Sequence, residues 1–304
     1  MYTYTWYQWL LFFYFYCFVG WIFESAYVSV KKRKFVNRGF LHAPMLPLYG
    51  SGAIVILFVA IPVRSQWYLV FLLGALAATA LEYVTGVAME AMFKVRYWDY
   101  SDKKLNFQGQ ICLSSSLAWG VLSVLLTEVI HRPVERWVTE KIPVMAEMII
   151  AVAISVIFVA DTAVSFADAW KLRTILEKMT AIKADIEALQ KRFEEVSAAK
   201  LEELSAIREE SFAWLTGLRE ESKERRIARK QTVESALSGL NADVRQQLLK
   251  HLEHLKKYHH SIKVQPFHLR HSILKRNPSA VSRKFNDAMT EYKKRLDEWK
   301  RERM

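Results

Sequence analysis

Five apolar segments of about twenty residues constrain the fold of this chain more than any other feature. A helix needs roughly 20 mostly apolar residues to cross the hydrocarbon core of a bilayer, and only helices or closed barrels satisfy their backbone hydrogen bonds there. We therefore predict an all-α polytopic membrane bundle of about five spans, followed by a cytoplasmic helical coiled-coil tail. The spans are Trp6–Val28, Pro44–Val63, Trp67–Met92, Ile111–Ile130 and Val144–Ala167.

Charge divides the chain into two unlike parts. Of the 43 Lys and Arg residues only 13 precede position 171, whereas 11 of the 31 acidic residues do, so most of the net charge of +12 lies in the second part. We predict a transmembrane bundle over 1–170 and a basic cytoplasmic tail over 171–304.

Basic residues are dense in alternate loops. They crowd the loops after the first and third spans and are sparse or diluted by acids in the other two. The positive-inside rule then places the N-terminus outside and the tail in the cytoplasm, in a cell (cytoplasmic, or inner) membrane. The first span lacks a basic leader and a small-residue cleavage site, so we expect it to be retained. Cys17 and Cys112 fall within spans and imply no disulfide framework.

Acidic residues within or beside the spans are the first candidates for function. Charged groups inside a bilayer are costly and usually face the protein interior or a wet cavity. We expect a functional or buried-pair role for Glu82 and Asp161, whereas Glu24, Glu90, Asp99 and Asp168 could equally reach interfacial water or pair with loop cations. Glu128 and Glu147 should be solvated near the outer ends. The candidates for binding a substrate or ion, or for lining a cavity, are Glu24, Glu82, Glu90, Asp99, Asn106, Ser116 and Asp161.

The stretch from Gly39 to Gly52, GFLHAPMLPLYGSG, is irregular for a membrane segment. Pro44 and Pro47 oppose a regular helix start, and Gly50 allows a close backbone approach. This segment is either a broken helix that lines a cavity or a kinked entry to an ordinary span. We favour the cavity, because polar residues of the stretch 97–120, which joins the third span to the fourth, approach from the same side. These residues are Asn106, Ser114, Ser115 and Ser116.

Four runs resemble successive motifs of a known family: GFLHAPMLPLYGSG, LEYVTGVAMEAMF, YWDYS and NFQGQICLSSSLAWG. Together, over about residues 20–125, they are similar to the bacterial membrane-protein family of putative ABC-transporter type IV permeases. The resemblance implies a transport role. Ala43 departs from the glycine expected before Pro44. Besides the acidic candidates, the motif positions include Pro44, Pro47, Tyr49, Gly50, Gly86, Trp98, Tyr100, Gly109, Trp119 and Gly120.

Motifs of common catalytic sites are absent from the sequence. There is no phosphate-cradling G-x-x-x-x-G-K-[ST] loop, no G-x-S-x-G, no H-E-x-x-H and no cysteine pair at zinc spacing. We therefore predict no catalytic residues, no metal and no cofactor, and any ATP-driven role would need a separate ATPase subunit.

The tail contains a heptad pattern from Leu172 to Val196, which predicts a coiled coil and a possible homo-oligomer. Further amphipathic stripes cover Val244–Leu255 and Val281–Trp299, and either a second copy or the same chain could cover the heptad stripe. Histidines at 251, 254, 268 and 271 lack the carboxylate or thiolate that would complete a metal set. Anionic lipid head groups lie closer to this basic tail than nucleic acid, which we do not expect as a partner.

Three functions fit these patterns. The first is a permease-like transport component with a polar cavity open to the cytoplasm, where Glu82 and Asp161 contact a cation, a proton or a polar substrate. The second is a membrane-anchored scaffold or sensor whose tail recruits partners. The third is an enzyme that acts on lipid head groups through Glu90, Asp99 and Asn106, although no nucleophile or metal set supports it.

Overall fold

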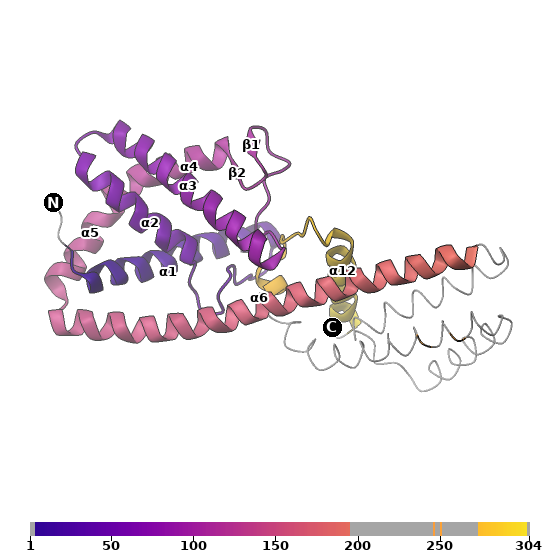
Figure 1. The fold of residues 1–304 in the computed structure, drawn as a ribbon. Coiled ribbons are helices and arrows are strands. Elements are labelled where there is room, and N and C mark those ends of the chain that lie inside the picture. The colour runs from indigo at the N-terminus through magenta and orange to yellow at the C-terminus, as the bar shows by residue number, and fades with distance from the viewer. Residues whose placement is uncertain (1–3, 195–245, 247–249, 251–272, 303–304) are drawn as a thin grey trace. The chain divides into compact units, whose positions relative to one another are not determined.

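The computed structural model describes residues 4–194, 246, 250 and 273–302 (Figure 1). These residues divide into two compact units. The first contains the chain up to Trp170 together with a later segment that ends at Val281, and the second begins at Lys171 and resumes at Ser282. The tail predicted from the sequence comprises the whole chain after residue 170, whereas Ile273–Val281 belongs to the unit that contains the membrane bundle.

The first unit is helical, and four of its helices are long and apolar enough to cross a membrane. This confirms a helical membrane protein. The second predicted span, Pro44–Val63, corresponds instead to a shorter apolar helix, Pro47–Val63. The helices of this unit are α1 Trp6–Lys32, α2 Pro47–Ala60 with η1 Ile61–Val63, α3 Trp67–Phe93, α4 Leu113–Leu125, α5 His131–Arg136 and α6 Val144–Glu194.

The connection between α1 and α2 explains why α2 is short. α1 ends at Lys32, and the residue that caps it, Arg33, adopts a left-handed conformation with φ of 50°. The chain then turns back along α1, because the Leu46 N–H donates to the carbonyl oxygen of Cys17 at 2.9 Å. Cys17 lies 15 residues before the end of α1, a distance of about 22 Å along the helix axis. Residues 34–46 therefore form a re-entrant connection, and α2 begins inside the bundle.

This re-entrant connection is irregular only up to Leu46. From Pro47 onward the chain is a regular helix, with proline in its first turn where no N–H is needed. Non-helical backbone at membrane depth must find its hydrogen bonds within the protein or in water. Here the N–H groups of His42 and Ala43 donate to Asp161, and that of Leu46 donates to Cys17.

The fourth span is longer than expected. The predicted span ends at Ile130, but the helical path continues without a break to Lys141. Pro133 lies within this path, and a π-helical turn, η2 Leu126–Ile130, immediately precedes α5, with a second, η3 Trp137–Lys141, after it. Wide π turns accommodate the missing N–H and the ring of a proline. The expected loop that carries Arg132, Arg136 and Lys141 is therefore helical.

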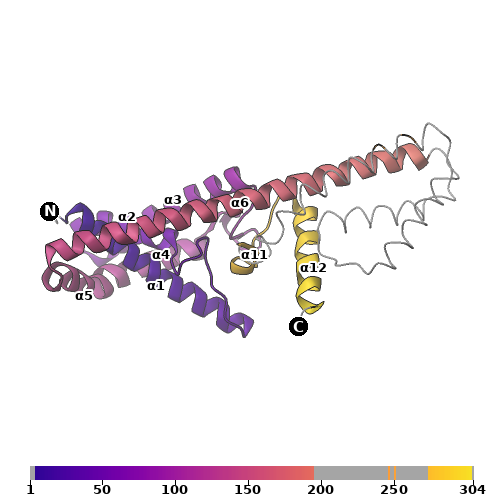
Figure 2. The same ribbon diagram turned by 90° about the horizontal axis from the view of Figure 1, so that it is seen from below.

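The remaining helices pack along α1 and α3. Figures 1 and 2 show α6 running along α1, where the Tyr14 hydroxyl donates to Ser155 Oγ at 2.7 Å. Between α3 and α4 lies a short hairpin of β1 Asn106–Phe107 and β2 Ile111–Cys112, paired antiparallel. Cys17 and Cys112 are both buried and free.

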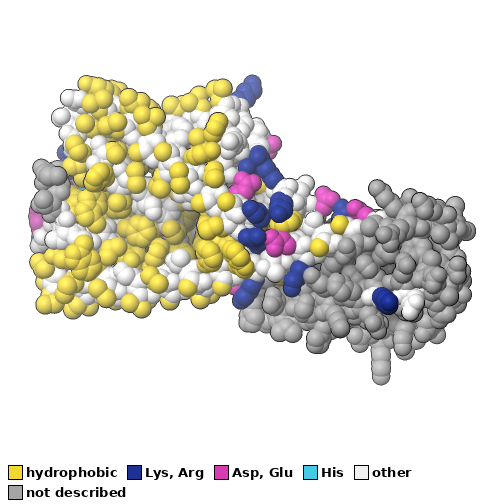
Figure 3. All heavy atoms as spheres, in the orientation of Figure 1, with side chains coloured by type: hydrophobic (Ala, Val, Ile, Leu, Met, Phe, Trp, Pro, Cys, Tyr) yellow, Lys and Arg dark blue, Asp and Glu magenta, His cyan; other side chains and the backbone are white. Residues whose placement is uncertain are grey.

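The outer surface of this unit suits lipid. Large hydrophobic side chains such as Phe58, Trp67 and Ile149 are exposed, and Figure 3 shows hydrophobic atoms covering the visible face of the bundle. Charged side chains gather at one edge of this face. A soluble protein rarely exposes so continuous an apolar surface, which supports its interpretation as a lipid-facing surface.

The second unit contains the last part of α6 and the helix α12 Asn286–Glu302. One stripe of α12 is buried, and Asp287 at its start pairs with Lys183 of α6. The first three heptad residues, Leu172, Ile175 and Met179, are also buried within the single chain. The end of the heptad pattern, the stripe Val244–Leu255 and the histidine pairs lie outside the described residues. The buried residues of the α12 stripe are Ala288, Met289, Tyr292 and Leu296.

Candidate functional site

A buried glutamate lies at the centre of the candidate site. Glu82 is only 4% exposed, on a face of α3 that is otherwise lined by Gly74, Ala78 and Gly86. One carboxylate oxygen accepts a hydrogen bond from the Tyr100 hydroxyl at 3.0 Å, and the other accepts one from Trp119 Nε1 at 3.1 Å. The small residues of this face allow neighbouring groups to approach, so the carboxylate is enclosed by protein.

A second acidic residue lies close to this glutamate. Glu24 on α1 accepts a hydrogen bond from the Tyr49 hydroxyl at 2.8 Å, and its other oxygen lies 3.8 Å from Arg38 Nε. The Tyr49 ring packs 5.7 Å from that of Trp119, which joins the two acidic sites. We call this group the inner cluster; its members are Glu24, Arg38, Tyr49, Glu82, Tyr100 and Trp119.

Two groups of the inner cluster lie outside the spans and have shifted acidities. Burial lowers the pKa of Arg38, an effect that the charge of Glu24 opposes. Burial raises the pKa of the Tyr100 hydroxyl, and the nearby charge of Glu82 raises it further. Tyr100 therefore stays protonated and keeps donating to Glu82 at physiological pH.

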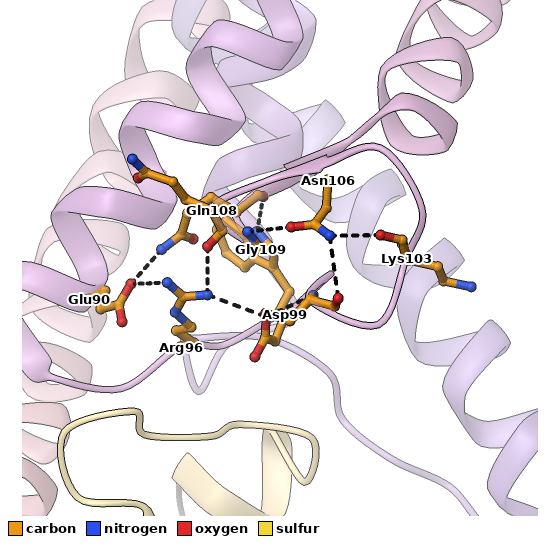
Figure 4. A network of polar contacts seen from close by, with 10 residues as sticks. Glu90, Arg96, Asp99, Lys103, Asn106, Gln108 and Gly109 are labelled. Carbon is orange, nitrogen blue, oxygen red and sulfur yellow. Dashed lines mark hydrogen bonds and ion pairs between the residues drawn. The ribbon is translucent and has the colours of Figure 1, made fainter.

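A buried arginine organises the loop after α3 (Figure 4). Arg96 Nη2 lies 2.8 Å from Glu90 Oε2, while Nη1 lies 3.3 Å from Asp99 Oδ1 and donates to the Gln108 carbonyl oxygen at 2.9 Å. Gln110 Nε2 also donates to Glu90, at 2.6 Å. Burial alone would lower the pKa of Arg96, but its bonds and attraction to Glu90 and Asp99 raise it overall. We call this arrangement the Arg96 knot.

Asn106 shapes the turn that faces the Arg96 knot. Its Nδ2 donates to the carbonyl oxygens of Ser101 and Lys103, and its Oδ1 accepts from the Gly109 N–H at 3.0 Å. Gly109 has φ of 71°, and a side chain there would collide with Asp99 and Arg96. The amide of Asn106 and the carboxylates of Glu90 and Asp99 are thus engaged in holding the hairpin.

Asp161 holds the re-entrant connection against α6. Its Oδ1 accepts from the His42 N–H at 3.1 Å and its Oδ2 from the Ala43 N–H at 2.8 Å. The His42 ring lies between two carboxylates, with Nδ1 3.0 Å from Asp161 and Nε2 3.3 Å from Asp168. Ala43, at the position where the motif suggests glycine, contributes only this backbone donor to the contact.

The remaining motif residues lie at close contacts. Ser116 Oγ donates to the carbonyl oxygen of Cys112, the residue just before α4, at 3.2 Å, and Trp98 Nε1 donates to that of Gln110 at 2.9 Å. A side chain at Gly86 would collide with Gln110, one at Gly120 with the Phe71 ring, and one at Gly50 with Phe13 and Cys17. Pro44 lies in the irregular part of the re-entrant connection. These positions chiefly permit close packing.

Several polar residues of the site were missed in the sequence. Arg38 and Arg96 were interpreted only as positive charges of inner loops, and His42 was not considered. Near the other end of the bundle, buried His131 contacts the hydroxyls of Tyr4 and Tyr16 at 3.2 and 2.9 Å. In the sequence, each of these residues could be noticed only as a polar residue inside or next to an apolar segment. That position indicates a site, but it does not reveal which distant residue is the partner.

One expectation about the outer acids was wrong. Glu147 is fully buried and accepts from Gln8 Nε2 at 3.2 Å, because α1 covers the start of α6. Glu128 is not simply solvated, since it pairs with Arg132 and lies 3.7 Å from Arg64. Among the described residues, no group of three or more His, Cys, Asp or Glu side chains could hold a metal ion.

The fold and its buried polar groups define a polytopic helical membrane protein with an acidic cluster inside the bundle. The chain belongs to the putative ABC-transporter type IV family, whose sequence profile matches residues 11–166. This match confirms the resemblance of the motifs. No curated protein and no solved structure matches the chain.

Proposed function

We propose that the protein is the membrane-spanning permease component of a transporter, with the inner cluster as its binding site. The observation that carries this proposal is the carboxyl group of Glu82, enclosed between Tyr100 and Trp119 within an apolar bundle. Placing a charged side chain inside a membrane costs a few kcal/mol of insertion free energy even on the lowest scales. The presence of Glu82 is therefore most simply explained by a function. A transported cation, proton or polar solute would interact with it from the cytoplasmic side.

The surrounding parts have roles in this proposal. The Arg96 knot forms the inner rim, and the re-entrant connection, held by Asp161, forms one wall of a polar cavity. Asp161 is the second group that a cation or polar substrate would meet. We propose an N-out, C-in orientation in the cell membrane, in contact with anionic lipids, with a second copy able to pair through Leu172–Val196. A separate ATPase subunit would supply energy if transport is driven by ATP.

The scaffold or sensor function remains the second candidate. It is favoured by the seating of Ile273–Val281 of the predicted tail in the bundle unit, because such contact links cytoplasmic and membrane parts. The lipid-enzyme alternative has less support. Glu90, Asp99 and Asn106 already form the bonds that hold the hairpin.

The experiment compares Glu82→Gln with Glu140→Gln, an exposed glutamate of the same chain. Purified protein in detergent is first screened by thermal stability against a panel of cations and polar solutes, and each stabilising solute is then tested by counterflow in proteoliposomes. We expect Glu82→Gln to reduce flux by roughly tenfold or more because it removes the buried charge, while Glu140→Gln stays near the wild type. Equal flux in the two variants would overturn the proposal.

A further inference from the structure

The segment Ile273–Val281 lies far from the bundle in sequence but belongs to the same compact unit. It begins with the short helix α11 Ile273–Arg276 (Figure 2). Ile273 and Leu274 are buried, and Asn277 is only 3% exposed. A segment from a basic, polar part of the chain is therefore enclosed within this unit, and its contacts explain how.

The end of the segment pairs with the loop after α3. Val281 donates its N–H to the Arg96 carbonyl oxygen at 3.0 Å, and the Arg96 N–H donates to the Val281 carbonyl oxygen at 2.7 Å. The two residues thus form an isolated antiparallel bridge, whose backbone bonds give affinity without depending on side chains. The paired residue is the same arginine whose side chain organises the Arg96 knot.

Asn277 binds the loop after α1. Its Nδ2 donates to the Gly39 carbonyl oxygen at 2.8 Å, and its Oδ1 accepts from Arg38 Nη1 at 3.2 Å. Arg38 also donates through Nη2 to the Tyr97 carbonyl oxygen at 3.3 Å, so one guanidinium joins both inner loops and the segment. Because a buried amide that loses its partners is costly, these bonds select asparagine at this position.

Arg276 adds a positive charge to the same region. It is 5% exposed, and among the residues that the structure describes its Nε and Nη2 atoms have no hydrogen-bond partner. Burial lowers its pKa, while the nearby carboxylates of Asp161 and Asp168 oppose that shift. These are the two carboxylates that flank His42, so the segment contributes charge where the re-entrant connection is held.

A chain of contacts runs from the segment to the inner cluster. Asn277 binds Arg38, Arg38 lies beside Glu24 at 3.8 Å, and Glu24 accepts from Tyr49. We propose that Ile273–Val281 is a latch, whose docking surface is the pair of inner loops at Arg38–Gly39 and Arg96–Tyr97. While it is seated, Arg38 is held between Asn277 and Glu24; its release frees Arg38 and alters the cytoplasmic side of the inner cluster. Only this last consequence rests on the proposed transport function.

The test measures hydrogen exchange of the full-length protein in lipid nanodiscs, which needs no transport activity. In the wild type we expect the backbone amides of Arg96 and Val281 to be protected. Asn277→Ala should make both exchange roughly tenfold faster, because it removes the two side-chain hydrogen bonds that join the latch to Arg38 and Gly39. Asn286→Ala, at an exposed asparagine of α12, is the matched control and should leave both amides unchanged.

A second variant tests the latch through the backbone. Val281→Pro removes the N–H that donates to Arg96 and should release the Arg96 amide in the same way, while amides in α3 stay protected. Rapid exchange of the Arg96 and Val281 amides in the wild type would overturn the latch proposal. So would an Arg96 amide that exchanges in Asn277→Ala and in Val281→Pro as slowly as in the wild type. If the latch variants behave as expected while Glu82→Gln leaves flux intact, the transport proposal fails and the latch stands.

Discussion

At the scale of single residues, two arginines do more than contribute to the charge pattern of the loops. Arg38 and Arg96 each contact acids and backbone carbonyls from several segments. Their sequence positions indicated only inner loops, because the positive-inside rule counts charges without pairing them. A guanidinium with donors in a planar fork can bridge several partners at once, which the ammonium of lysine cannot do with the same geometry.

Arg96→Lys tests this difference. The lysine could pair with Glu90 or Asp99 but not also with the Gln108 carbonyl oxygen, so partners inside the knot would be left without donors. We expect a loss of about 1–3 kcal/mol in the free energy of unfolding, because buried acceptors of the knot lose their hydrogen bonds while the charge is kept. Thermal or denaturant unfolding in detergent would measure it. Arg136→Lys, at an exposed arginine, is the control, and an equal loss there would contradict the role of the knot.

At the scale of elements, apolar length and composition predicted most helices but not the start of α2 or the length of the fourth span. Residues 34–46 follow α1 back into the bundle because Asp161, 118 residues away in sequence, accepts the N–H of Ala43. Local propensity cannot reveal such a partner. The glycines and prolines of this stretch did signal irregular backbone, since these residues relieve close contacts or omit a donor.

The close approach of α2 to α1 is tested by two glycines of α2. A Cβ at Gly50 would lie 2.7 Å from the Phe13 carbonyl oxygen and would also meet Cys17 Sγ, whereas one at Gly52 would lie 3.4 Å from the Trp119 ring. Gly50→Ala should therefore destabilise the protein by about 1–3 kcal/mol, as overpacking does. Gly52→Ala should be neutral, or stabilising by up to about 1 kcal/mol from helix propensity. Unfolding of both variants in detergent measures this, and similar stabilities would argue against the tight contact.

At the scale of the whole molecule, the path of residues 34–46 and α2 is compatible with the charge pattern on which the five-span prediction rests. α2 starts near the level of Cys17, and the chain continues through η1 to Arg64, which lies 3.7 Å from Glu128 of the fourth span. Residues 34–46 and α2 together thus return the chain toward the opposite end of the bundle. The charge pattern predicts which end of the bundle each loop reaches and does not depend on the path between the loops. The orientation that follows from it stays a prediction.

This path yields an orientation test by labelling single cysteines in intact cells, in a background that lacks Cys17 and Cys112. We expect a membrane-impermeant maleimide to label Ser65→Cys and Ile142→Cys from outside, because these positions follow α2 and the fourth span at the end of the bundle that is poor in basic residues. Lys34→Cys and Lys104→Cys, in the basic loops, should react only after the cells are permeabilised. If Ser65→Cys were protected in intact cells while Ile142→Cys reacted, α2 would not reach the outer surface, and the re-entrant connection would have to end at an inner loop. Labelling of Lys104→Cys in intact cells would instead show that the bundle has the opposite orientation, with the latch, its docking surface and the tail outside the cell.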